Sequence, residues 1–125
     1  MSRVRGKDTT PERIVRSALH LAGYRFRLHG ADLPGKPDIV LPKHHTVIFV
    51  NGCFWHQHPG CRKATVPKHN NRFWQRKLKR TAQRDQQNKA KLLRLGWKVI
   101  TLWECQIGNS IDSCIIHVTK CLRHV

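Results

Sequence analysis

The chain has 125 residues, and its 24 lysines and arginines against 7 acidic residues give a formal net charge of +17 at pH 7. This length suits one domain, residues 1–125, and argues against two independent cores. No apolar run approaches the ~20 residues that a membrane-spanning helix needs, and the polar N-terminus lacks the apolar segment of a secretory signal. So large a charge indicates a polyanionic partner, with nucleic acid as the first candidate. The alternatives are a merely basic soluble protein and a ribosomal-type binder.

The first elements along the chain are a helix and a strand. Thr10, Pro11 and Glu12 are typical of a helix start, with a hydroxyl N-cap, proline at the first helical position and an acid in the first turn. Apolar residues then recur at helical spacing as far as Ala22. The alternation of apolar and basic residues over 24–28 predicts a half-buried strand.

The middle of the chain is predicted to add two more strands. A short strand is expected over 38–41, and a turn over 42–45 leads to a continuous apolar strand over 46–50. Three consecutive strands with short connections favour an antiparallel meander. Residues 51–70 follow as an irregular segment rich in cysteine, histidine and proline.

The C-terminal half is predicted to contain a long helix over about 71–95, a strand over 97–103 and a last helix over 111–122. The order is therefore α-β-β-β-α-β-α. Because the last strand is reached through a helix, it can pair in parallel. We expect an α/β fold, with a mixed sheet flanked by helices.

The long helix carries an unusual charge pattern. Residues 72–94 contain nine basic residues and one acid, Asp85. Leu78 is the only large apolar residue between Trp74 and Leu92. Such a helix is either solvated or lies along an anionic surface.

The cysteines suggest a metal site rather than disulfides, because their number is odd and nothing signals export. Cys53, His58 and Cys61 supply two thiols and an imidazole within nine residues, which is the softness and spacing of a tetrahedral zinc site. Cys105, directly after a strand, is the candidate for the fourth ligand. A closed four-ligand site would be structural. The alternative is a coincidental cluster in a basic loop.

Two other residues suggest hydrolytic chemistry. Asp38 begins a strand directly after Pro37, and its hard carboxylate oxygens suit Mg²⁺, which offsets charge on a phosphodiester during hydrolysis. The alternative for Asp38 is a turn-capping role. His56 is one histidine too many for the four-ligand site, so it is a candidate general base. The alternatives for His56 are a fifth metal ligand and a bystander.

Two aromatic pairs, Phe54-Trp55 and Phe73-Trp74, lie beside basic residues. Large rings amid positive charge can stack on bases or wedge between base pairs. The alternative is that these rings belong to the core, and it is stronger for the pair on the helix than for the pair in the irregular segment.

Several strings of residues, spread in order over nearly the whole chain, resemble the very-short-patch repair endonucleases, the Vsr-type enzymes that nick DNA at mismatches. Gly52-Cys53-Phe54-Trp55-His56, followed far downstream by Trp103-Glu104-Cys105, is the most specific of them. The other strings are Arg5-Gly6-Lys7-Asp8-Thr9, Leu33-Pro34-Gly35-Lys36-Pro37-Asp38, Val47-Ile48-Phe49-Val50, Phe73-Trp74 and Gly96-Trp97-Lys98-Val99.

The resemblance implies a restriction-endonuclease-like fold with a structural zinc site. It also implies an enzyme that uses Mg²⁺ and acts on double-stranded DNA with a T·G mismatch left by deamination of 5-methylcytosine. The expected reaction is a nick on the 5′ side of the mispaired thymine. By the same resemblance we expect a bacterial cytoplasmic monomer, with other mismatch-repair proteins as possible partners. The alternatives are a DNA-binding module that is stabilised by zinc and has no catalytic activity, and a nicking nuclease of broader mismatch specificity.

The resemblance also implies the roles of residues around the reacting phosphate. Asp38 matches the metal-binding aspartate, and the backbone carbonyl of Val50 matches a main-chain Mg²⁺ ligand. His56 matches the histidine proposed as general base, and Asp85 an acid that orients it. Glu12 matches an acid near the metal-bound waters.

Other positions match residues with structural or DNA-binding roles. The structural zinc ligands would be Cys53, His58, Cys61 and Cys105. The aromatic wedge that opens the duplex would be Phe54, Trp55 and Trp74. The basic residues expected to contact DNA are Lys7, Arg72 and Lys77.

Two departures from the family pattern affect these expectations. Asn51 stands at a catalytic position that is often histidine in the family, and an asparagine can hydrogen-bond a phosphate but cannot carry a positive charge. Family members also often have more residues ahead of the point that corresponds to Met1 here, including an arm that grips DNA. The expected consequence is weaker anchoring on DNA or a broader choice of mismatch.

Overall fold

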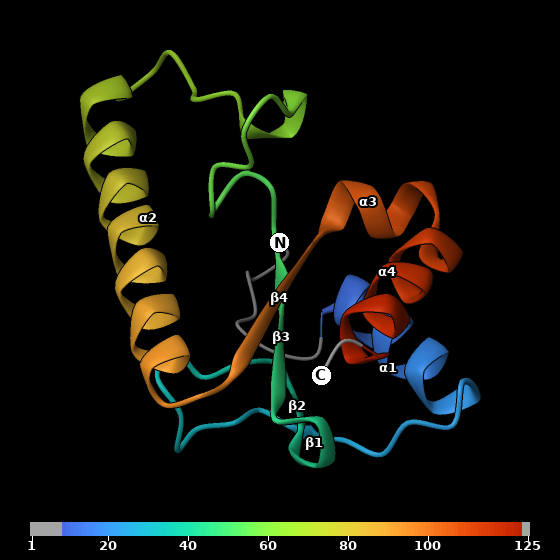
Figure 1. The fold of residues 1–125 in the computed structure, drawn as a ribbon. Helices are drawn as coiled ribbons and strands as arrows, with labels where there is room; N and C mark the ends of the chain where they lie inside the picture. Colours follow the sequence, from blue (N-terminus) through green and yellow to red (C-terminus); the bar gives the residue numbers. More distant parts are fainter. Residues whose placement is uncertain (1–8, 124–125) are drawn as a thin grey trace.

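The computed structural model describes residues 9–123, and Lys7, one of the residues expected to contact DNA, lies outside this range. The described chain folds into one four-stranded sheet with helices on both sides (Figure 1). Its elements are, in chain order, α1 (Thr10–Leu21), β1 (Arg27–Leu28), β2 (Ile39–Leu41), the 3₁₀ turn η1 (Pro42–His44), β3 (Thr46–Asn51), the 3₁₀ turn η2 (Arg62–Ala64), α2 (Asn71–Arg94), β4 (Lys98–Trp103), α3 (Glu104–Asn109) and α4 (Ile111–Arg123).

The sheet is mixed, as the order of elements predicts. Its strands lie in the order β1-β2-β3-β4. The first three strands form an antiparallel meander, and β4 pairs with β3 in parallel. The short connections of the meander only allow antiparallel neighbours, whereas α2 provides the crossover that a parallel pair requires. The predicted fold class, α/β with a mixed sheet flanked by helices, is confirmed.

Alternate residues of the strands build two hydrophobic clusters, one on each face of the sheet. Figure 1 shows α1, α3 and α4 on one side of the sheet and α2 on the other. The larger cluster joins strand residues such as Ile48 and Leu102 to α1, α3 and α4. The smaller cluster joins Val40 and Val47 to Leu92 of α2. A strand that is buried on both faces has a continuous apolar run in its sequence, which is why the run over 46–50 identified β3.

The first helix begins one residue earlier than the sequence signals suggested. Thr9, not Thr10, is the N-cap, and its hydroxyl oxygen accepts a hydrogen bond from the backbone N–H of Glu12 at 3.4 Å. Thr10 and Pro11 therefore occupy the first helical positions, where the missing N–H of proline costs nothing. This start turns Glu12 inward, and the side chain is buried.

The predicted strand over 24–28 is largely wrong. Only Arg27 and Leu28 form a strand, and both are exposed. The reason is that β2 offers only a short partner, and the ladder is limited to Arg27 opposite Val40 and Leu28 opposite Ile39. Tyr24 and Phe26 still pack against the larger hydrophobic cluster. The alternation of apolar and basic residues over 24–28 therefore predicted the partial burial of these two side chains, although neither residue pairs in a strand.

The helix α3, six residues directly after β4, was not predicted. The side chain of Gln106 accepts a hydrogen bond from the backbone N–H of Trp103 at 3.3 Å, and Ile107 is buried in the larger cluster. A helix this short has too few residues to display a helical period. It follows that α3 is fixed by tertiary packing rather than by local preference.

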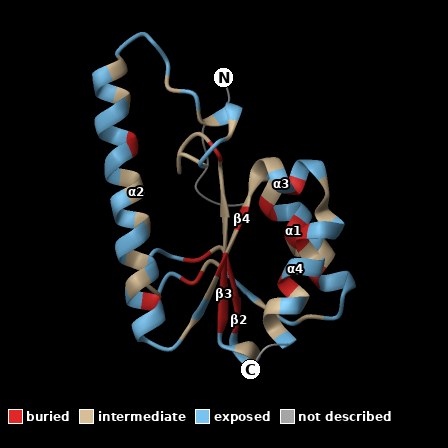
Figure 2. Ribbon diagram, turned by 45° about the horizontal axis from the view of Figure 1, so that its top comes forward, coloured by how far each residue is buried: buried red, intermediate tan, exposed pale blue. Residues whose placement is uncertain are grey.

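The long helix α2 has the expected extent and charge pattern. Figure 2 shows that most of its surface is exposed, and its two buried residues are Leu78 and Leu92. The nine basic residues of the helix are all exposed. In residues 9–123, no helix is both long enough and apolar enough to span a membrane.

A pair of adjacent leucines tests the packing of α2 on the sheet. Leu92 is fully buried in the smaller cluster, whereas Leu93 is 52% exposed. We expect Leu92→Ala to lower the free energy of unfolding by ~2–4 kcal/mol, since it leaves a cavity. The control Leu93→Ala should change it by less than ~0.5 kcal/mol. Urea denaturation measures both, and equal effects would contradict the packing described here.

Candidate active site and metal centre

The candidate site is a cavity of about 650 Å³ between the sheet and α2. Its walls include Asp38, Val50 and Asn51 from the sheet region, together with His56 from the loop after β3 and Asp85 from α2. These five residues lie far apart in the sequence. The structure therefore brings the expected catalytic residues other than Glu12 to the wall of one cavity.

Asp38 lies directly before β2 and beside β3. Its Oδ2 accepts a hydrogen bond from the backbone N–H of Val50 at 2.7 Å. Burial raises the pKa of Asp38 to about 7, the Val50 hydrogen bond opposes this rise, and the neighbouring carboxylate of Glu12 adds to it. A cation next to Asp38 would stabilise its ionised form. The carboxylate oxygens of Asp38 are the type of ligand that hard divalent cations prefer.

Glu12 reaches the neighbourhood of Asp38 from α1, on the opposite side from α2. Its side chain is 1% exposed and has two basic partners. Nε2 of His29 lies 3.1 Å from Oε2 of Glu12, and Nη1 of Arg16 lies 3.4 Å from the same oxygen. A polar side chain this deeply buried needs hydrogen-bond partners, and these two basic side chains supply them.

His56 and Asp85 form a hydrogen-bonded pair across the cavity. Nδ1 of His56 lies 2.6 Å from Oδ2 of Asp85. This contact favours the imidazole tautomer with its proton on Nδ1, which leaves Nε2 able to accept a proton. In this arrangement His56 could act as a general base whose imidazole is held by a carboxylate.

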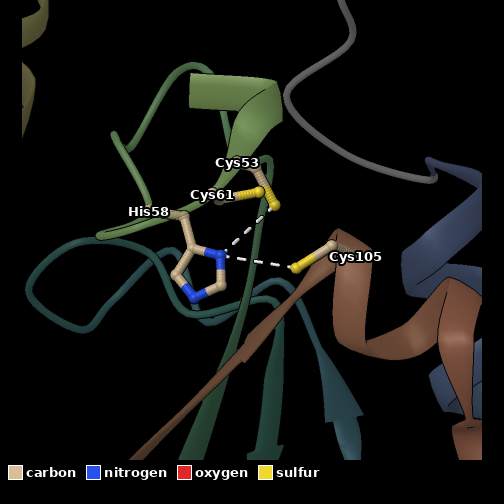
Figure 3. A group of neighbouring side chains, drawn as sticks. All are labelled: Cys53, His58, Cys61 and Cys105. Carbon is tan, nitrogen blue, oxygen red and sulfur yellow. Dashed lines mark hydrogen bonds between the residues drawn. The ribbon is translucent and has the colours of Figure 1, made fainter. Parts of the chain in front are cut away.

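Beside the cavity, four side chains converge on one point (Figure 3). Their ligand atoms all lie within 4.8 Å of one another, so the group could hold a metal ion. The Sγ atoms of Cys53 and Cys105 lie 3.7 and 3.4 Å from Nδ1 of His58. Cys61 completes the group. The predicted grouping of these four residues is confirmed.

Two further contacts hold this metal centre against the sheet. Oε1 of Glu104 accepts a hydrogen bond from the backbone N–H of Cys53 at 3.1 Å, which joins the loop to the end of β4. The ring of His58 stacks on Trp103, with centroids 4.2 Å apart. Burial raises the pKa of the Cys53 thiol to about 12.

The aromatic residues form a separate cluster at the end of α2 near the loop. The ring of Phe54 lies 5.2 Å from Trp55 and 5.5 Å from Trp74, measured between centroids. Nζ of Lys77 lies 5.7 Å from the Trp55 centroid, and Phe73 is 57% exposed. None of these rings belongs to either hydrophobic cluster of the described residues. The interpretation that they form the core is therefore wrong.

Some site residues were not found from the sequence. His29, Arg16, Trp103 and Glu104 were not predicted to contact the acids or the metal ligands, although Trp103 and Glu104 lie next to Cys105. Three of these contacts join residues on different elements, which no spacing rule marks, whereas the i, i+4 spacing of Glu12 and Arg16 on the predicted helix is a signal that could have found Arg16. Arg72, expected to contact DNA, is exposed in the first turn of α2.

Comparison with known proteins adds independent information. Residues 1–63 match the family model described as DNA mismatch endonuclease Vsr. The chain is 50% identical over 109 residues to the type II nicking enzyme V.XorIIP of Xanthomonas oryzae, covering 87% of this chain and 79% of the relative. It is 43% identical to the type II nicking enzyme V.NmeAIP of Neisseria meningitidis, covering 87% and 77%. It is 38% identical to the DNA mismatch endonuclease Vsr of Escherichia coli, covering 86% and 68%.

Substitution of one cysteine tests the metal centre. We expect freshly purified, reduced protein to hold one metal ion per chain, and Cys61→Ala to lose it and to melt at a lower temperature, because metal binding contributes directly to folding. Cys121→Ala is the control, since Cys121 lies on α4 away from the cluster. Elemental analysis by mass spectrometry gives the metal content. Metal-free wild-type protein would contradict the assignment.

Proposed function

The chain belongs to the DNA mismatch endonuclease Vsr family, and on that premise we propose that it nicks duplex DNA 5′ of the mispaired thymine in a T·G mismatch. Family membership establishes a DNA-nicking endonuclease, and the substrate is DNA. The single observation that carries the catalytic assignment is that Asp38 and the His56–Asp85 pair line the same cavity.

In the proposed reaction, His56 acts as the general base. Nε2 of His56 takes a proton from a water molecule while the water oxygen bonds to phosphorus and one P–O bond of the backbone breaks, and the leaving oxygen takes a proton from solvent. Asp85 holds the imidazole through Nδ1 and stabilises the positive charge that it gains. Asn51, at the end of β3, lines the cavity and would hydrogen-bond a phosphate oxygen.

The residues around Asp38 fit a catalytic Mg²⁺ ion. The Asp38 carboxylate and the backbone carbonyl of Val50 would hold it, and Glu12 would orient its waters. When bound, Mg²⁺ would offset the negative charge that builds on the phosphate.

For the cysteine–histidine centre, we propose Zn²⁺ in a structural role. Three thiols and one imidazole match its ligand preferences, and four protein ligands leave no open position for catalysis. A tetrahedral zinc ion separates its sulfur and nitrogen ligands by about 3.6 Å, by bond lengths of ~2.3 and ~2.05 Å. The distances of 3.7 and 3.4 Å to Nδ1 of His58 agree with this value.

DNA binding is proposed to combine the basic surface of α2, Arg72 and Lys77 included, with the aromatic cluster. Exposed basic residues supply sequence-independent attraction to phosphates. Phe54, Trp55 and Trp74 lie in or beside the loop that carries His56, so rings inserted at the mismatch would set its distance from the phosphate that is cut. We propose that the enzyme acts as a monomer.

A panel of duplexes tests this function. Each duplex carries one of the possible mismatches, and a matched duplex serves as the reference. With Mg²⁺ present, we expect a nick in the thymine strand of the T·G duplex, on the 5′ side of the thymine, mapped on a sequencing gel. Binding without a cut in any duplex would favour the non-catalytic module. Equal cutting at several mismatches would favour the nuclease of broader specificity.

A conservative substitution separates catalysis from folding. Asp38→Asn keeps the shape of the side chain and is expected to abolish nicking of the T·G duplex, because the amide is a poor ligand for a divalent cation. The matched control is Asp112→Asn, since Asp112 is exposed in the first turn of α4. The control should nick like the wild type. If Asp38→Asn melted at the same temperature as the wild type and also nicked at the wild-type rate, Asp38 would not be a catalytic residue.

The wedge is tested with two tryptophans. We expect Trp55→Ala to lose mismatch selectivity and nicking rate, because ring–base stacking contributes ~1–3 kcal/mol per base. Its affinity for matched duplex should largely remain, since α2 supplies it. The control Trp97→Ala removes a ring from the smaller hydrophobic cluster and should lower the melting temperature without a specific loss of selectivity. If Trp55→Ala instead lost stability and all DNA binding together, the wedge role would be wrong.

A further inference from the structure

We propose that His29 is a positioning residue that holds the carboxylate of Glu12 in place beside Asp38. This inference rests on the proposed function, because it gives Glu12 a part in orienting the waters of the metal ion. Among the described residues, neither Glu12 nor His29 lines the cavity. His29 therefore acts through Glu12 and not on the substrate.

The first observation is the contact between the two side chains. Nε2 of His29 lies 3.1 Å from Oε2 of Glu12, a carboxylate that is 1% exposed, whereas the His29 side chain is 28% exposed. Arg16 contacts the same oxygen from one turn further along α1. The arginine contact stays within one helix, whereas the His29 contact ties Glu12 to the segment between β1 and β2, in addition to the contact of Glu12 with Asp38.

The second observation is the backbone of His29. Its N–H donates a hydrogen bond to the backbone carbonyl of Asp38 at 2.9 Å, and the next N–H, of Gly30, donates to Pro37 at 2.9 Å. One residue thus contacts both acids, Asp38 through its amide and Glu12 through its ring. A shift of either acid relative to the other would break one of these two hydrogen bonds.

The third observation is that His29 adopts a left-handed backbone conformation, with φ of +51°. A non-glycine residue pays a free-energy cost for this conformation, and such strain persists only where the surroundings enforce it. The neighbouring Gly30 is buried, and a Cβ atom there would meet Cγ2 of Val40 at 2.8 Å. The turn is therefore locked against β2, and it directs the imidazole toward α1.

Two amide substitutions separate the side-chain role from the backbone role. Asparagine is well tolerated in the left-handed conformation, but its side chain is one methylene shorter than that of glutamine. His29→Gln can place its amide nitrogen close to the position of Nε2 and can still donate to Glu12. His29→Asn keeps the backbone conformation and cannot reach Glu12. If the role of His29 were only to form the turn, asparagine would replace it at least as well as glutamine.

The readouts are binding of Mn²⁺ to DNA-free protein by electron paramagnetic resonance, and kcat and KM for nicking of the T·G duplex with Mg²⁺. We expect His29→Asn to weaken Mn²⁺ binding and to lower kcat by roughly tenfold or more, the usual effect of losing a partner behind a metal site. KM for DNA should stay unchanged, and His29→Gln should restore most of both losses. In a Glu12→Gln background, His29→Asn should add no further loss.

Three results would overturn the inference. They are wild-type values for His29→Asn, equal impairment of His29→Asn and His29→Gln, and a full additional loss in the Glu12→Gln background. Melting temperatures of all variants show whether each one folds. If the wild-type protein nicked no mismatched duplex, the proposed function would fail, and the Mn²⁺ comparison of the two amide variants would still decide the role of His29.

Discussion

The parallel pairing of β3 with β4 is the constraint on which the rest of the site depends. Six residue pairs run in register from Thr46 opposite Lys98 to Asn51 opposite Trp103. Because parallel strands end at the same edge of a sheet, the segments that follow β3 and β4 start next to each other at that edge. Cys53 and Cys105 are thereby brought into one cysteine–histidine cluster, and Glu104, which lies 51 positions after Cys53, accepts a hydrogen bond from the backbone amide of Cys53. The antiparallel neighbour β2 places Asp38 beside Val50 at the same edge.

This arrangement divides the molecule into a part with a hydrophobic core and a loop with little buried apolar surface. The sheet with α1, α3 and α4 carries the larger hydrophobic cluster, whereas the loop after β3 contributes only Cys53 to the buried apolar residues. A segment with so little apolar burial needs another source of order, and small folds commonly use a metal ion for this. The same loop carries His56 and two of the aromatic rings. The cluster of Cys53, His58, Cys61 and Cys105 thus helps to hold these groups near Asp38, together with the His56–Asp85 hydrogen bond.

Much of this could be predicted from the sequence, and the exceptions have a common cause. The continuous apolar run identified β3, and the soft ligands Cys53, His58 and Cys61 predicted a grouping that Cys105 completes in the structure. Contacts that depend on how separate elements pack could not be predicted. The approach of His29 to Glu12 requires α1 to lie against the sheet, and the stacking of His58 on Trp103 requires the register of β3 and β4. The helix α3 was missed for the same reason.

The most direct test of the account measures amide hydrogen exchange before and after the metal is removed by a chelator. The backbone N–H groups of His58 and Cys61 donate hydrogen bonds within the loop, to Cys53 and His58. Local opening exposes such amides without unfolding the rest of a protein. The account predicts that amides of residues 53–61 lose protection, while those of residues 47–50 and 99–102 keep theirs. Unchanged protection of the loop, or simultaneous loss of protection in loop and sheet, would contradict the claim that the metal centre orders this loop on an independently stable sheet.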